Sequence, residues 1–256
     1  MIAELIKNTH KAKLDLHTHS NFCDGKSSAE EMVRAAIKKG LSVLGIVTHA
    51  YIPFEDFYTI HPGKVGAFQQ EIRRLSDVYK DKITLLCGVE ADPVSTMSYE
   101  GFSYILGSSH YFGRADDMRS VDMSPESFKH AVSELFNGDV IAAADNYYQQ
   151  LTKVAELNPD IIGHFDLVTK FNEKLGLIDE QSGLYRCAWQ KAADELLKLR
   201  VPFEINTGGI TRGWKTSYYP SDEILRYLEG KGAQFVISSD AHRLEQVGAF
   251  HYKFND

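Results

Sequence analysis

The sequence has 256 residues, is 43% hydrophobic, and carries a formal net charge of −7 from 35 acidic and 28 basic residues. This length predicts one α/β domain spanning residues 1–256, and the charge argues against nucleic acid or an anionic membrane as partner while still allowing a small phosphorylated ligand. The three scattered cysteines and the lack of an export signal or membrane-spanning run predict a cytoplasmic protein.

Seven short segments have the apolar or alternating pattern of β-strands. They are residues 12–17, 42–49, 83–90, 104–110, 160–166, 201–206 and 233–240. Helical patterns at 27–40, 124–136, 182–200 and 219–232 lie between them, and we see no long insertion. Alternating strands and helices are typical of parallel strands joined by crossovers, so the pattern predicts a barrel rather than an open sheet.

Two of the helices have clear start signals. Ser28 and Glu31 form a candidate capping box, with Gly40 as the stop. Ser124 is a candidate N-cap followed by Pro125 at the first helical position.

Histidine, carboxylate and amide side chains gather at the carboxyl ends of the predicted strands. These residues are His17, His19, His49, Glu90, His110, His164, Glu204, Asn206, Asp240 and His242. In a parallel barrel all of these ends open onto one face, where active sites are built. Six of the ten histidines therefore converge on one site.

His17 and His19 indicate what this site binds. Residues two apart on a strand point to the same side, so both imidazoles can reach one ion while Thr18 faces away. One histidine at one strand end is more often an ordinary buried residue. The whole set of imidazoles and carboxylates favours a divalent metal such as zinc, manganese or iron.

The same segments resemble the PHP (polymerase and histidinol phosphatase) superfamily. The motifs are DLHTHSNFCDG (15–25), VTH (47–49), GVE (88–90), GSSH (107–110), IGHFD (162–166) and SSDAH (238–242). Residues 163–171 and 203–225 further resemble the histidinol-phosphate phosphatase branch. The resemblance implies a distorted (β/α)7 barrel, in agreement with the seven strands counted independently.

The resemblance also implies three divalent metal ions. The implied ligands of the first are His17, His19, Glu90 and Asp240. Glu90 would bridge to the second ion, which His110 and His164 complete, and Asp24, His49 and His242 would hold the third. Asp24 stands where some members have a histidine, which can change the metal at that position.

The implied reaction is hydrolysis of a phosphate monoester, most specifically of L-histidinol phosphate to L-histidinol and inorganic phosphate. We expect a hydroxide bridging two ions, one of them held through Glu90, to attack phosphorus directly. Arg212, Lys170 and Arg243 are the candidates to clamp the phosphate oxygens. Lys170 departs from the more arginine-rich segment of this branch.

The group that protonates the leaving alkoxide stays open among His49, His242 and a metal-bound water. Residues 51–63 combine Glu55 and Asp56 with several aromatic rings. This segment is either a lid that receives the cationic end of the substrate or a surface loop packed on the rim. His61, within it, is a further candidate for the substrate pocket.

Three alternatives remain. The chain could be another PHP phosphoesterase acting on nucleotides or generic phosphomonoesters, or an amidohydrolase-type metal-dependent deaminase. Such deaminases often use a bridging modified lysine, whereas Glu90 stands at the bridging position here. A non-catalytic metal-binding scaffold is the third, although the ligand set looks complete.

Overall fold

The computed structural model describes residues 2–114 and 116–251. Within these ranges, a seven-stranded parallel sheet has the order β1-β2-β3-β4-β7-β8-β9, and β5 and β6 form a separate antiparallel hairpin. The strands are β1 (Leu14–Thr18), β2 (Val43–His49), β3 (Thr84–Ala91), β4 (Tyr104–Gly107), β5 (Tyr111–Arg114), β6 (Asp117–Ser120), β7 (Ile161–Ile162), β8 (Phe203–Asn206) and β9 (Phe235–Ser238).

The α-helices differ widely in length. They are α1 (Ile2–Asn8), α2 (Ala29–Lys38), α3 (Val65–Tyr79), α4 (Pro125–Phe136), α5 (Val140–Thr152), α6 (Asn172–Leu175), α7 (Gly183–Leu196), α8 (Gly208–Thr211) and α9 (Asp222–Gly230). In the described part of the chain, no helix combines the length and apolar character that a bilayer crossing requires.

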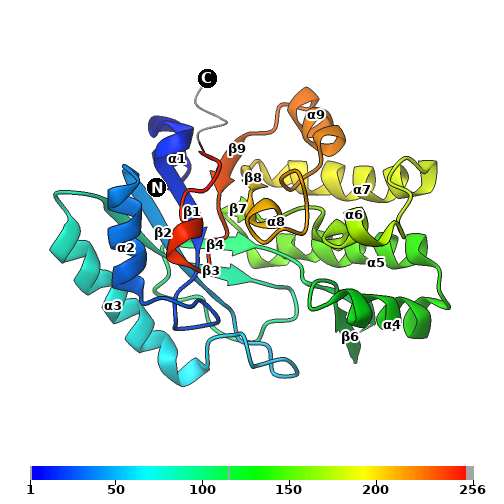
Figure 1. The fold of residues 1–256 in the computed structure, drawn as a ribbon, viewed down its shortest axis with the longest axis horizontal. Coiled ribbons are helices and arrows are strands. Elements are labelled where there is room, and N and C mark those ends of the chain that lie inside the picture. Colours follow the sequence, from blue (N-terminus) through cyan, green and yellow to red (C-terminus); the bar gives the residue numbers. More distant parts are fainter. Residues whose placement is uncertain (1, 115, 252–256) are drawn as a thin grey trace.

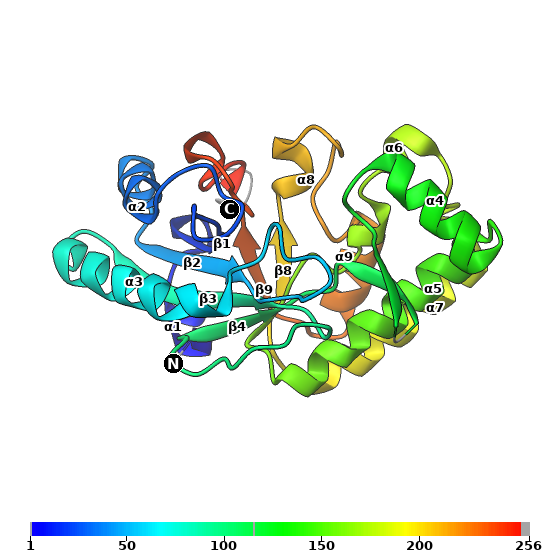
Figure 2. The ribbon, with the colours of Figure 1, turned by 90° about the horizontal axis from the view of Figure 1, so that it is seen from below.

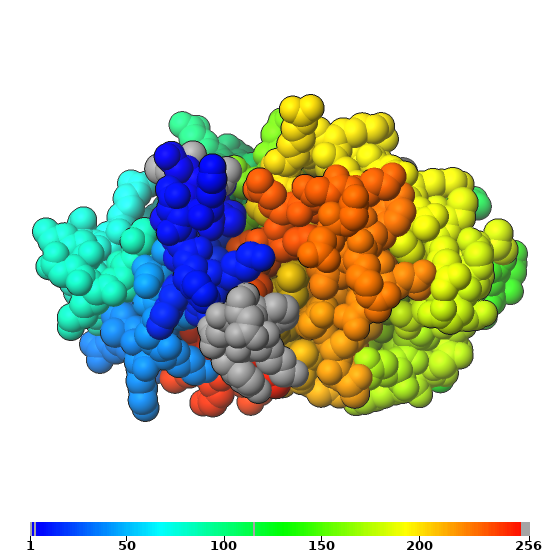
Figure 3. Space-filling view, turned by 90° about the horizontal axis from the view of Figure 1, so that it is seen from above, coloured from blue at the N-terminus to red at the C-terminus, as the bar shows by residue number. Residues whose placement is uncertain are grey.

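The sheet nearly closes on itself where β1 meets β9. Thr18 forms a parallel bridge with Ala241, and the His19 N–H donates to the Ala241 carbonyl at 2.8 Å. The Asp15 carboxylate accepts hydrogen bonds from the Ser239 N–H at 3.0 Å and from its hydroxyl at 2.5 Å. Segments from the two ends of the chain therefore lie side by side (Figure 3). The predicted distorted (β/α)7 barrel is confirmed.

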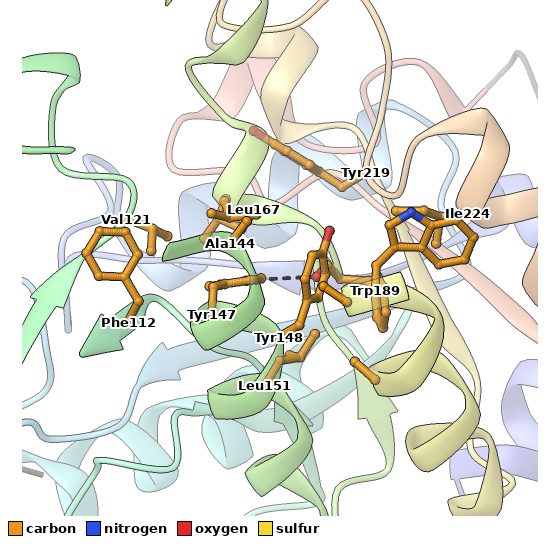
Figure 4. Close-up of a cluster of buried hydrophobic side chains, with 14 of the residues drawn as sticks. Phe112, Val121, Ala144, Tyr147, Tyr148, Leu151, Leu167, Trp189, Tyr219 and Ile224 are labelled. Atoms are coloured by element: carbon orange, nitrogen blue, oxygen red, sulfur yellow. Dashed lines mark hydrogen bonds between the residues drawn. The ribbon is translucent and has the colours of Figure 1, made fainter. Parts of the chain in front are cut away.

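Helices cover the barrel on two sides (Figures 1 and 2). On one side, α2 and α3 bury Met32, Val33 and Phe68 in a shared apolar cluster. On the other side, α4, α5, α7 and α9 enclose a larger cluster in which Tyr148 and Trp189 are almost fully buried (Figure 4). These two layers hold the strands in place and leave their carboxyl ends open to the site.

The predicted helix starts are confirmed by their hydrogen bonds. The Ser28 hydroxyl accepts from the Glu31 N–H at 3.3 Å, while the Glu31 carboxylate accepts from the Ser28 N–H at 2.8 Å. This reciprocal pair satisfies two N–H groups that the first helical turn leaves unpaired. Ser124 likewise accepts from the Ser127 N–H at 3.0 Å, with Pro125 as the first residue of α4.

The expectation of no long insertion was wrong. The chain between β4 and β7 carries the β5–β6 hairpin, α4 and α5, of which the sequence predicted only the helix at 124–136. The short β7 also differs from the predicted strand at 160–166. It ends because the His164 N–H donates to a side chain, the Glu204 carboxylate, at 2.8 Å instead of to a neighbouring strand.

The Tyr104 side chain of β4 contacts the three strands that precede it in the sheet, β1, β2 and β3. Tyr104 is the register partner of Gly88 in β3, and its hydroxyl donates to the Leu16 carbonyl of β1 at 2.6 Å. A Cβ at Gly88 or at Gly45 of β2 would overlap the Tyr104 side chain. Glycine is therefore required at both positions by the close approach of this ring.

Gly88→Ala should lower the free energy of unfolding by about 1–3 kcal/mol, because the buried Tyr104 ring has no room to move aside. Denaturant unfolding followed by circular dichroism measures the change. Gly66→Ala in α3 is the matched control, since a Cβ there meets nothing within 4 Å. That control should raise stability by about 0.4–1 kcal/mol. Equal effects of the two substitutions would contradict the packing argument.

Candidate metal centre and active site

The predicted ligands lie at or just beyond the carboxyl ends of the parallel strands. His17 lies in β1, His49 is the last residue of β2, and Glu90 is near the end of β3. The register pairs His49 directly with Glu90. His19 follows β1 directly, and the loops after β4, β7 and β9 add His110, His164, Asp240 and His242, so groups far apart in the sequence meet above the barrel.

Glu90 is the centre of this cluster. Its carboxylate is buried and lies within 3.5 Å of imidazole nitrogens from five histidines. From Oε2 the distances are 3.2 Å to His17 Nε2, 3.5 Å to His19 Nε2 and 3.0 Å to His49 Nδ1, and from Oε1 they are 2.9 Å to His164 Nε2 and 3.4 Å to His110 Nε2. Among the described residues, no lysine or arginine forms an ion pair with it.

The donor atoms fit divalent metal ions. His17 Nε2 faces His19 Nε2 at 3.1 Å, and the buried Glu90 Oε2 has no hydrogen-bond partner among the described residues. Nitrogen lone pairs and a carboxylate oxygen that converge in this way need a positive charge between them. Three groups of ligand atoms lie close enough to hold an ion: His17 with His19 and Asp240; His49 with Glu90 and His110; and His19 with Asp24, His49 and His242.

These three groups contain most of the predicted ligands. Their assignment of ligands to individual ions differs from the assignment that the family resemblance implied. His49 takes the place beside Glu90 and His110 that was predicted for His164. His164 is still adjacent, with Nε2 at 2.9 Å from Glu90 Oε1. All nine predicted ligands therefore lie in one cluster, and their assignment to individual ions stays a prediction.

Asp24 reaches the cluster from the loop after β1. Its carboxylate lies 3.1 Å from His242 Nε2 and 3.6 Å from His49 Nε2. Burial alone would raise the pKa of Asp24, but the charges of His49 and the hydrogen bond from His242 hold it below its ordinary range. Asp24 is therefore available as a charged oxygen ligand.

The predicted ligands differ in their pKa shifts. Burial lowers the pKa of His17, but the charges of Glu204 and Glu90 outweigh that effect and raise it well above its ordinary value. Burial would raise the pKa of Glu90, yet the neighbouring charges of His17, His49 and His110 hold it well below its usual value. Burial lowers the pKa of His19, and the charges of His242 and His49 lower it further. Glu90 is thus ionised and His19 neutral, the forms in which both residues ligate metals.

The pKa of His110 is raised, whereas that of His19 is lowered. Burial lowers the pKa of His110, but the charge of Glu90 and a hydrogen bond to Asp92 outweigh that effect and raise the pKa to about 9. Its Nδ1 lies 3.5 Å from the Asp92 carboxylate. A carboxylate on one ring nitrogen directs the other nitrogen toward Glu90.

Glu204 forms hydrogen bonds with two of the predicted ligands, His17 and His164. The sequence placed it at a strand end without assigning it a role. It is fully buried, with Oε1 at 2.7 Å from His17 Nδ1, while Oε2 accepts from the His164 N–H at 2.8 Å and from Asn206 Nδ2 at 2.9 Å. By holding His17 Nδ1, Glu204 leaves Nε2 facing the cluster. Two polar residues spaced two apart in an otherwise apolar strand were the available signal.

The three predicted phosphate clamps all line the cavity above this cluster, which has a volume of about 880 Å³. Arg212 forms a two-point contact with Asp240, from Nη2 to Oδ1 at 2.8 Å and from Nη1 to Oδ2 at 3.0 Å. Lys170 Nζ pairs with the Asp122 carboxylate at 2.9 Å. Arg243 is exposed at the rim, and so is Lys26, which the sequence reasoning missed.

His61, the further candidate for the substrate pocket, caps a short helix. It is exposed and is not among the residues that line the cavity. Its Nδ1 accepts from the Gly63 N–H at 3.1 Å and caps the short 3-10 helix Pro62–Lys64. Proline at the first position of that helix favours this capping role.

The sequence matches the PHP domain family over residues 15–208. The chain belongs to this family. The match contains most of the ligand cluster, whereas Asp240 and His242 lie beyond it. The predicted resemblance to the PHP superfamily is thereby confirmed.

Individual relatives match along almost the whole chain. The probable histidinol-phosphatase of Schizosaccharomyces pombe is 26% identical, covering 91% of this chain and 81% of the relative. The histidinol-phosphatase of Bacillus subtilis is 24% identical, covering 94% and 98%. The crystal structure of histidinol phosphate phosphatase from Lactococcus lactis, complexed with zinc, L-histidinol and phosphate, has a TM-score of 0.65 at 21% identity and covers 91% and 87%. That structure has the same fold as this chain.

Glu204→Gln should lower the affinity for zinc by about 10- to 100-fold, because the amide would turn an NH₂ group toward His17 Nδ1 or the His164 N–H. Competition with a chromophoric chelator measures this affinity. The control is Glu229→Gln, which removes an exposed carboxylate on α9. If both variants bind zinc like the parent protein, Glu204 does not position the ligands.

Proposed function

We propose that this protein is a metal-dependent phosphatase that hydrolyses L-histidinol phosphate to L-histidinol and phosphate. The observation that carries the proposal is the convergence of six imidazoles with Asp24, Glu90 and Asp240 on one face of the barrel, beneath a cavity whose lining includes Lys170, Arg212 and Arg243. The relatives named histidinol-phosphatase support the choice of substrate. The zinc, L-histidinol and phosphate bound to the Lactococcus lactis enzyme support it further.

We infer that three divalent ions, drawn from zinc, manganese and iron, occupy the ligand cluster. The residues that would hold them are His17, His19, Asp24, His49, Glu90, His110, His164, Asp240 and His242. When bound, such ions lower the pKa of water toward neutrality and neutralise charge on phosphoryl oxygens. Glu90 has the central role among the ligands, because its two oxygens face different histidines.

Arg212, Lys170 and Arg243 bind the outer phosphate oxygens in this proposal. Arginine suits this task because its planar fork offers paired N–H donors to an oxyanion. Arg212 also holds Asp240 by two contacts, so it positions a ligand while it lines the cavity. Lys170 is held by Asp122 and lines the same cavity.

The leaving alkoxide needs a proton, and the candidate donors remain His49, His242 and a metal-bound water, since a histidine can donate only from a nitrogen that does not ligate an ion. Both histidines line the cavity, and the Asp24 carboxylate lies between their Nε2 atoms. Neither histidine is preferred over the other by these contacts.

The direct test is phosphate release by the purified protein reconstituted with zinc, manganese or iron. The expected result is a kcat/KM for L-histidinol phosphate well above that for nucleoside monophosphates and p-nitrophenyl phosphate. Glu90→Gln should remove nearly all turnover together with part of the metal content. Equal rates on all esters would indicate a generic phosphoesterase, and ammonia release without phosphate release would indicate a deaminase.

Arg212→Ala should raise KM for L-histidinol phosphate by about 10- to 100-fold, because the ester loses a charged donor pair. Steady-state kinetics at matched metal content measures the change, which separates substrate binding from the loss of support for Asp240. Arg226→Ala on the exposed face of α9 serves as the control. An unaltered KM would remove Arg212 from the phosphate site.

A further inference from the structure

Glu55 stands apart from the other acidic residues around the cavity. It lies in the loop between β2 and α3, is half-buried, and lines the cavity wall. Its carboxylate accepts a hydrogen bond from the Tyr111 hydroxyl, and the Tyr58 hydroxyl lies 2.6 Å from that of Tyr111. This chain of hydroxyls holds the carboxylate in one orientation.

The cavity acids are otherwise already matched by nearby basic groups. Asp122 pairs with Lys170 at 2.9 Å and Asp240 with Arg212 at 2.8 Å. Asp24 and Glu90 face imidazoles. Across the described residues, Glu55 forms no ion pair with a lysine, arginine or histidine. Glu245, which also lines the cavity without such a pair, is exposed at the rim.

This unmatched carboxylate is partly shielded from water. Burial raises the pKa of Glu55, and the Tyr111 hydrogen bond offsets only part of that effect. A half-buried carboxylate of this kind gains more from an incoming cation than an exposed one does, because less water screens the attraction.

Aromatic rings complete the same wall. Phe57 and Tyr58 line the cavity, with their ring centroids 5.4 Å apart. The Tyr58 ring stands edge-on to the His49 ring at 4.9 Å, so this wall adjoins the ligand cluster directly. Aromatic faces beside a carboxylate are a typical environment for an organic cation. Glu55 lines the same cavity as His49, Glu90 and His110 of the ligand cluster.

We propose that Glu55, held by Tyr111 and flanked by Tyr58 and Phe57, is the subsite for an organic cation and selects phosphate esters that carry an ammonium group. The inference rests on the proposed function and adds the residue that recognises the non-reacting end of the substrate. It also assigns a role to the loop 51–63, whose Glu55 side faces the cavity while Asp56 stays exposed.

The test compares two esters that differ only in the ammonium group: L-histidinol phosphate and its desamino analogue, 3-(imidazol-4-yl)propyl phosphate. Glu55→Gln should lower kcat/KM for L-histidinol phosphate by about 10- to 100-fold, the size expected for a hydrogen-bonded charge pair. The desamino ester should be hydrolysed by Glu55→Gln and by the parent protein at similar rates. Asp56→Asn, which removes the neighbouring exposed charge, should leave both rates unchanged.

The outcomes separate this inference from the proposed function. If the parent protein hydrolyses L-histidinol phosphate efficiently but Glu55→Gln lowers both esters alike, or neither, the cation subsite is overturned and the proposed function stands. If the parent protein does not prefer L-histidinol phosphate to the other esters, both fail. Unchanged metal content and thermal unfolding of Glu55→Gln exclude a folding defect as the cause of any loss.

Discussion

The buried Glu90 carboxylate is the constraint on which the site depends. An ionised carboxylate removed from water is expensive unless positive charge or hydrogen-bond donors surround it. Here the compensation comes from imidazoles on other strands and loops. These residues can meet only if the strands run parallel and in register, so the chemistry of one side chain depends on the topology of the whole barrel.

Charged side chains in the cavity wall are also compensated by groups of opposite charge, here in direct ion pairs. Arg212 is fixed by Asp240, and Lys170 by Asp122. Each pairing costs the cation some of its attraction for an anion, but it also holds a long side chain in one place. In the proposed function, an incoming phosphate would meet these fixed donors, and discrimination among phosphate esters would fall to the side of the cavity where Glu55 lies.

The sequence was sufficient to predict much of this arrangement, because period-two alternation and parallel topology together determine where strand ends lie. The gathering of histidines and carboxylates at the strand ends and the capping box at Ser28 follow from such local rules, whereas Asp24 was implied by the family resemblance. The β5–β6 hairpin, α5 and the early end of β7 did not, since each depends on tertiary contacts such as the bond from His164 to Glu204. The grouping of ligands and the contacts of Glu55 likewise depend on distances that a sequence does not contain.

The closure of the barrel has a consequence for how the protein matures. Asp15 and Ser239, which join β1 to β9, are 224 positions apart, and the ligands His17 and Asp240 are their near neighbours. A chain emerging from the ribosome therefore exposes its first imidazoles long before their last carboxylate partner exists. In the proposed three-ion centre, full metal loading would therefore require that the two ends of the chain have already joined.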